Sequence, residues 1–309
     1  MPIEFDDSRV DVGGVDDRRG GGMGGLGGGG LAVGGGMGVV GLIVYLIFNV
    51  LGGGSGGGGT GGLGIPIEAG SGAGSSGQSE TREQLQQRCN SSGALDQYTD
   101  CRLIKVYNVA DTVWSQEFER RNLPYQRPKI VFFNGQTRTG CGSASASTGP
   151  FYCPPDRELY FDLQFLQELQ DRFGAQGKFA QAYIVAHEFG HHLQTLLGTE
   201  PKVRAAQERN PSLANRYSVA LELQADCYAG VWAKLADQSQ QNGITLTSDN
   251  IAEAQKAAAA VGDDRIQQET QGRVNPENYT HGTAEQRATW FRTGVDSGDI
   301  DRCNTFQQG

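Results

Sequence analysis

The chain has 309 residues and a formal net charge of −9, and 30 of its 47 glycines lie before Gln78. This length allows one sizeable domain or two small ones, and we place the folded part in residues 80–309, where glycine returns to an ordinary level. The negative charge argues against a nucleic-acid partner, because binding phosphates requires clustered lysine and arginine and the sequence contains no basic stripe.

The residues before the folded part divide into three segments. Residues 1–30 are acidic and then glycine-rich without apolar periodicity, which predicts a disordered tail. Residues 31–51 are uncharged and strongly apolar in their second half, and a stretch of about twenty such residues predicts one transmembrane helix. Residues 52–79 are rich in glycine and serine and predict a flexible tether that spans about 30 Å.

The placement of arginine orients this predicted membrane helix. It is preceded by Arg9, Arg18 and Arg19, and the first basic residue after it is Arg82. Because basic residues flank the cytoplasmic end of a span, we predict a single-pass membrane protein with a cytoplasmic N-terminus and a periplasmic or extracellular domain. A cleaved signal peptide fits less well, since the preceding region is long and acidic and no small-x-small cleavage site follows.

Elements expected within residues 80–309 indicate a helix-rich α+β domain with a small β-sheet. In chain order we predict helices in parts of 80–114, a strand at 128–133, a strand within 149–162, a helix from 162 to about 173, an amphipathic helix at 178–197, a helix from 211 to about 237 and a last helix through 290. Thr283 and Gln286 have the capping-box spacing for the last helix.

All six cysteines lie in this domain, and none forms the CxxC pair that is typical of cysteine zinc sites. An even number without metal spacing favours disulfides and an oxidising compartment. Among fifteen possible pairings we favour two short loops and the remaining pair, namely Cys89–Cys101, Cys141–Cys153 and Cys227–Cys303. Reduced, buried thiols in a cytosolic protein are the alternative.

The helix predicted at 178–197 carries the run from His187 through Glu188 to His191. Histidines four apart on a helix face the same side and can bind one metal ion, and Glu188 can take a proton from water at that ion. Imidazole nitrogens with one open coordination position suit zinc. Three of the four histidines lie in this segment, which favours a metal site over solvent-facing histidines. His192 faces elsewhere and has no assigned role.

A zinc site with two histidines needs a third ligand from another element. Glu222 and Asp226 are also four apart, on the otherwise apolar helix at 211–237. We predict that Glu222 binds the zinc ion and that Asp226 orients a histidine N–H. As alternatives, Asp226 binds the zinc ion and Glu222 orients the histidine, or both acids lie on a solvated face of the helix.

His281 precedes the last helix and can stabilise the oxygen that becomes negative during hydrolysis. A surface histidine is the alternative there. With one zinc ion activating water and Glu188 as the general base, the residues predict a metalloendopeptidase acting on peptides or proteins. We expect the substrate to add to a strand edge at residues 143–146.

Several motifs together resemble one family. HEFGHH at 187–192, ELQAD at 222–226 and THGTAEQRATWF at 280–291, with VDDRRG at 15–20, the glycine-rich segment and GPFYCP at 149–154, are similar to the neutral zinc metallopeptidases of bacterial membranes. More distantly, HExxH with a later ExxAD resembles zincins of the HtpX and CAAX-prenyl-protease type. That resemblance implies Glu222 as the third ligand and Asp226 beside it. A proline usually follows the corresponding histidine there, where this chain has Gly282.

The sequence therefore predicts a zincin-like hydrolase of peptide bonds, anchored in the cell envelope by one transmembrane helix and a glycine-rich tether. A competing hypothesis is a catalytically inactive protein that binds or scaffolds partners and is stabilised by zinc. Glu188 favours the enzyme, because a structural zinc site has no use for a general base beside its ligands.

Overall fold

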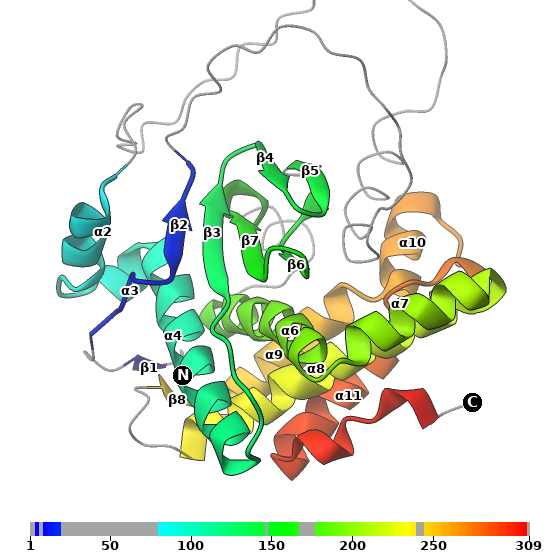
Figure 1. The fold of residues 1–309 in the computed structure, drawn as a ribbon. Coiled ribbons are helices and arrows are strands. Elements are labelled where there is room, and N and C mark those ends of the chain that lie inside the picture. The colour runs from blue at the N-terminus through cyan, green and yellow to red at the C-terminus, as the bar shows by residue number, and fades with distance from the viewer. Residues whose placement is uncertain are drawn as a thin grey trace, which may run out of the picture.

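The computed structural model describes residues 4–5, 9–19, 80–145, 148–166, 177–238 and 244–307. These residues form a helix-rich α+β fold with small sheets, as predicted (Figure 1). The helices are α2 (Arg82–Cys89), α3 (Ala94–Gln97), α4 (Thr99–Arg120), α6 (Lys178–Leu196), α7 (Thr199–Arg209), α8 (Ala214–Gln238), α9 (Ser248–Ala260), α10 (Asp263–Gln271) and α11 (Ala284–Ser297).

The main sheet has the strand order β2-β3-β7-β6. Its members are β2 (Val15–Asp17), β3 (Lys129–Phe133), β7 (Glu158–Asp162) and β6 (Phe151–Cys153). The strands β2 and β7 run parallel to β3, and β6 runs antiparallel to β7, so β2 and β6 are the two edges. A separate two-stranded pair joins β1 (Glu4–Phe5) to β8 (Ile244–Thr245).

The two faces of β3 pack against different layers. Ile130 and Phe132 belong to the main core with α4, α6 and α8, whereas Val131 and Phe133 belong to a second cluster with residues of β6 and Ala144. Ala144 lies in the hairpin of β4 (Gln136–Thr139) and β5 (Gly142–Ser145). Because both faces are covered, the strand is a continuous apolar run rather than an alternating one.

Most elements between residues 178 and 297 agree with the sequence prediction. The helix expected at 178–197 is α6, and Thr283 and Gln286 form the predicted capping box of α11, which continues past residue 290 to Ser297. The helix expected from 211 begins as a 3₁₀ turn at Pro211–Leu213 and becomes α8. The helix expected from residue 162 falls largely outside the described residues.

All three favoured disulfides are present. Cys89–Cys101 joins α2 to α4, Cys141–Cys153 joins the β4–β5 hairpin to β6, and Cys227–Cys303 joins α8 to the C-terminal segment. Every cysteine of the chain is therefore paired.

The prediction of a disordered tail at residues 1–30 is wrong for residues 9–19. Val15–Asp17 pair with β3, and Val10, Val12 and Val15 are buried in the main core. The local sequence shows no periodicity because the segment is held to the fold by residues more than sixty positions away.

The prediction of a single-pass membrane protein is also wrong. Within the described residues no helix has both the length and the apolar character that crossing a membrane requires, and residues 31–79 lie outside them. In addition, β2 and β3 flank that segment and are paired in one sheet. A single span would hold them on opposite sides of a hydrocarbon layer about 30 Å thick. The predicted orientation, with the N-terminus and the domain on opposite sides, fails for the same reason.

Candidate metal centre

Close contacts between helices bring α6 and α8 together at the site. A Cβ at Gly190 would lie 3.0 Å from both the Cα and the carbonyl oxygen of Ala225, so the glycine inside HEFGHH lets α8 approach α6 closely. The helices α8 and α11 cross at Gly230 and Gly294, where a Cβ on either would collide with the backbone of the other helix. Glycines at these contacts therefore determine how closely the three helices approach one another, and so how close their side chains lie at the site.

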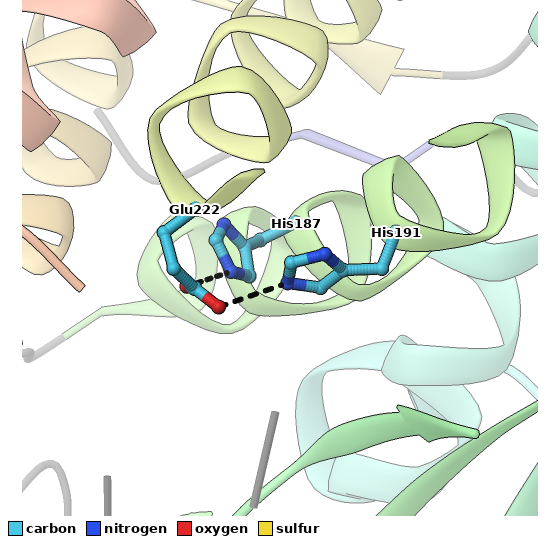
Figure 2. A group of neighbouring side chains, drawn as sticks. All are labelled: His187, His191 and Glu222. Carbon is cyan, nitrogen blue, oxygen red and sulfur yellow. Dashed lines mark ion pairs between the residues drawn. The ribbon is translucent and has the colours of Figure 1, made fainter. Parts of the chain in front are cut away.

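Two histidines from α6 and one glutamate from α8 converge at this contact (Figure 2). His187 Nε2 lies 3.2 Å from Glu222 Oε2, and His191 Nε2 lies 3.5 Å from Glu222 Oε1. The three candidate ligand atoms lie within 4.8 Å of one another, and all three residues are buried. A tetrahedral ion with bonds of about 2 Å holds its ligand atoms roughly 3.3 Å apart, so the spacing fits zinc.

Unpaired polar atoms also gather at this point. Four buried atoms without a hydrogen-bond partner belong to the site, namely Glu188 Oε2, His191 Nε2, Glu222 Oε2 and His281 Nε2. Elsewhere in the described residues only two tryptophan indole nitrogens are in this state. Since buried polar groups in proteins are almost always paired, their convergence indicates a cation and a polar ligand as the missing partners. Two imidazoles and a carboxylate form the donor set that zinc prefers.

Hydrogen bonds orient both imidazoles so that Nε2 faces Glu222. Asp226 Oδ1 lies 2.8 Å from His187 Nδ1, and Gln194 Oε1 lies 2.9 Å from His191 Nδ1. The Tyr183 hydroxyl donates to the same Asp226 oxygen. Such partners select the tautomer and raise the basicity of the ligand nitrogen. Asp226 thus lies behind His187, and Glu222 lies in front of it.

The charges around the three candidate ligands are suited to a cation. Burial alone would raise the pKa of Glu222, but the imidazoles of His191 and His281 hold it well below its usual range. Burial lowers the pKa of His191 to about 4, so this ring is neutral. Burial would also lower the pKa of His187, but Asp226 and Glu222 outweigh it and raise the pKa to about 9. A proton and a metal ion therefore compete for His187 Nε2.

Glu188 is buried beside these residues, close enough for the charges of His187 and Glu222 to act on its carboxyl group. Burial raises the pKa of Glu188 to about 7, with the nearby Glu222 carboxylate adding to the shift. A backbone hydrogen bond from Tyr152 of the edge strand β6 acts in the opposite direction. A carboxylate with this pKa can both accept and return a proton near neutral pH.

The structure places β6, not the predicted 143–146 edge, next to Glu188. Residues 143–145 lie in β5 of the hairpin, which covers the sheet face turned away from α6, and residue 146 is outside the described residues. His192, which had no assigned role, holds β6 in place, because its Nδ1 lies 3.1 Å from the Tyr152 hydroxyl. Its other nitrogen lies 2.7 Å from the carbonyl oxygen of Gln126.

His281 is held at the same site by a carboxylate that the sequence analysis missed. Asp263 Oδ2 accepts hydrogen bonds from three successive backbone N–H groups, at residues 280 to 282, and its Oδ1 lies 3.2 Å from His281 Nδ1. His281 is 1% exposed, so it is not a surface histidine. Gly282 has a φ of 88°, which proline cannot adopt.

Arg287 of α11 is the second missed residue. It is 1% exposed, its Nε donates to Asp226 Oδ2 at 2.8 Å, and its Nη2 lies 3.7 Å from Glu222. The guanidinium therefore offsets the two buried carboxylates on α8. The spacing of Arg287 to Phe291 and Gly294 places all three on one helix face, and that pattern could have revealed the arginine as buried.

Replacing Arg287 with methionine will leave Asp226 buried without its charged partner. We expect this variant to lose about 3–5 kcal/mol of unfolding free energy, the usual result of breaking a buried ion pair on one side. Chemical denaturation measures the loss. Adding Asp226→Asn to Arg287→Met should recover part of the lost unfolding free energy. If the losses of the two single variants simply add up in the double variant, the two residues do not form an ion pair.

Comparison with known proteins agrees with this centre. A family model described as "Putative neutral zinc metallopeptidase" matches residues 7–306. The chain belongs to this family. It is 51% identical over 202 residues to the uncharacterized protein YpfJ of Escherichia coli K12, covering 65% of this chain and 69% of that protein. It is 45% identical over 227 residues to the uncharacterized protein Rv2575 of Mycobacterium tuberculosis H37Rv, covering 71% and 74%. No solved structure matches.

Proposed function

We propose that this member of the family is an active zinc-dependent endopeptidase. The observation that carries the proposal is the set of four buried polar atoms without a hydrogen bond, from Glu188, His191, Glu222 and His281, around the His187–His191–Glu222 cluster. A purely structural zinc site would account for the ligand atoms but not for the carboxylate oxygen of Glu188. Leaving a carboxylate oxygen buried and unpaired costs stability, so its place requires a chemical use.

In the proposed mechanism His187, His191 and Glu222 hold one zinc ion. When bound there, the ion supplies Lewis acidity that activates water and polarises the scissile carbonyl. Glu188 accepts the proton of the attacking water and passes it to the leaving amine, as its pKa near neutrality allows. Asp226 and Gln194 keep the two imidazoles in the tautomers that present Nε2.

We assign to His281 the role of stabilising the oxygen of the scissile carbonyl when that oxygen becomes negative. Asp263 and Thr280 bind its Nδ1, so the buried Nε2 is the ring atom left to face the substrate, and it donates from a ring that carries a proton on both nitrogens. We assign an extended substrate to the free edge of β6, because that strand contacts Glu188 through Tyr152. This assignment replaces the predicted edge at 143–146.

The test compares the metal-free chain with the chain that holds one equivalent of zinc. Zinc should restore cleavage of an unfolded protein that a chelator had abolished. At a hundredfold excess over its dissociation constant it should also raise the unfolding free energy by about 2.7 kcal/mol. Stoichiometric zinc and the stability gain without any cleavage would favour the scaffolding protein instead.

A further inference from the structure

The N-terminal segment Arg9–Arg19 lies in a groove formed by β3, α2 and α4, at the sheet edge opposite to β6. Figure 1 shows this segment, drawn in blue, between β3 and the helices α2 and α4. Along the chain, residues 20–79 separate it from the rest of the fold. The segment therefore meets the domain as a peptide would meet a separate binding protein.

Side-chain amides of the domain bind the backbone of this segment. Asn90 accepts from the N–H of Val10 at 2.9 Å and donates to the carbonyl of the same residue at 3.1 Å. Asn108 does the same for Asp11, at 2.8 Å and 2.9 Å. Gln86 donates to the Val10 carbonyl and accepts from the backbone N–H of Val12 at 3.3 Å. Paired amide contacts of this kind hold an extended backbone whatever side chains it carries.

The side chains of the segment show which residues the groove accepts at each position. Val10, Val12 and Val15 are 1%, 2% and 6% exposed and fill the main core. Gly14 lies against the ring of Tyr107, and a Cβ there would collide with the tyrosine hydroxyl. The next residues continue as β2, with Ile130 N–H bonded to the Gly14 carbonyl at 3.0 Å. The groove thus accepts valine at three positions and excludes a side chain at one.

Two arginines end the segment and bind carboxylates of the domain. Arg18 lies 3.1 Å from Glu158, and Arg19 lies 2.8 Å from the buried Asp100. Asp100 also pairs with Arg88, which in turn pairs with Glu80, the first described residue after the gap. One ionic network therefore joins both ends of the intervening segment, so docking of residues 9–19 does not depend on the path that residues 20–79 take.

We propose that the groove of β3, α2 and α4 is a peptide-binding site whose ligand is residues 9–19 of this chain. The ligand pattern is valine at positions 10, 12 and 15, glycine at 14 and arginine at 18 and 19, with a turn at residues 13–14 followed by pairing of residues 15–17 parallel to β3. The covalent connection supplies an effective concentration on the order of mM, so each chain fills its own groove at micromolar protein. Once the connection is cut, the segment is an exchangeable ligand, open to replacement by the same segment of a second copy.

The test uses the full chain with the recognition sequence of a site-specific protease inserted within residues 52–79. After cleavage at micromolar protein, the N-terminal fragment should stay with the domain during size-exclusion chromatography. An excess of a synthetic peptide of residues 9–19 should displace it. A peptide with Gly14→Ala should compete about 5- to 150-fold less well, because overpacking costs about 1–3 kcal/mol. The matched control is Gly13→Ala, whose Cβ contacts only Asp11 of the segment itself.

Each outcome decides the proposal. A dimer of cleaved chains that the wild-type peptide dissolves supports it, because the same groove then holds the same segment in trans. Aggregation on cleavage that the wild-type peptide reverses also supports it. The proposal is overturned if the fragment separates at once while the melting temperature of the domain stays at its uncut value. Equal competition by the two alanine peptides, or aggregation that no peptide reverses, overturns it as well.

Discussion

Replacing Glu188 with glutamine will lower the rate of peptide-bond cleavage by about 10²–10⁴-fold, the range expected for losing a general base. The amide has the shape of the carboxyl group but cannot take a proton from water. Zinc content should stay at that of the wild type, because Glu188 is not among the three converging ligands. Stability should not fall, since the change removes a buried, unpaired carboxylate oxygen.

Cleavage of an unfolded protein, measured beside elemental zinc analysis, checks this prediction. Glu119→Gln is the matched control, because it makes the same chemical change at an exposed position of α4. That control should retain the wild-type rate. Activity of Glu188→Gln within a few-fold of wild type would remove Glu188 from the mechanism and leave the zinc site itself untouched.

Replacing Glu222 with alanine will remove one of the three proposed zinc ligands and weaken zinc binding by more than about 100-fold. This loss exceeds the one expected for a residue that only hydrogen-bonds a ligand. Asp226→Asn should weaken binding less, by about 10–100-fold, because Asp226 orients His187 from behind and does not face the ion. The order of the two effects distinguishes a ligand from an orienting residue, and so decides between the roles that the sequence left open.

Titration of zinc into the metal-free variants, followed by calorimetry or a competing chelator dye, measures both affinities. Glu208→Ala, at an exposed position of α7, should bind zinc as the wild type does. Wild-type affinity in Glu222→Ala would mean that another residue completes the site, and a larger loss in Asp226→Asn than in Glu222→Ala would reverse the two roles.

Features that depend on local spacing could be predicted from the sequence. His187 and His191 lie one turn apart on a helix, and the capping box at Thr283 is a local pattern, so both follow from residue order alone. Two of the three favoured disulfides close short loops, and this preference reduces the number of cysteine pairings to consider. Glu222 could be singled out because a charge on an apolar helix requires a partner.

Features that depend on distant contacts could not be predicted. The helical spacing of Arg287 can mark it as buried but does not name its partner, and only the crossing of α8 and α11 at glycine places it against Asp226. Residues 9–19 have too few apolar side chains to indicate a fold by themselves, and their partners lie on α2, α4 and β3. The same pairing overturned the predicted membrane topology, since it joins the two flanks of residues 31–51 in one sheet.

By itself, then, the order of residues determined the candidate ligands, the candidate general base and the favoured cysteine pairs, because helical periodicity and loop length are properties of neighbouring positions. The tertiary structure alone decided which strand meets Glu188, which residues hold His187 and His281, and where the N-terminal segment lies. Those contacts join positions tens to hundreds of residues apart. Burial and hydrogen bonding across such distances are properties of the packed molecule, and no local pattern encodes them.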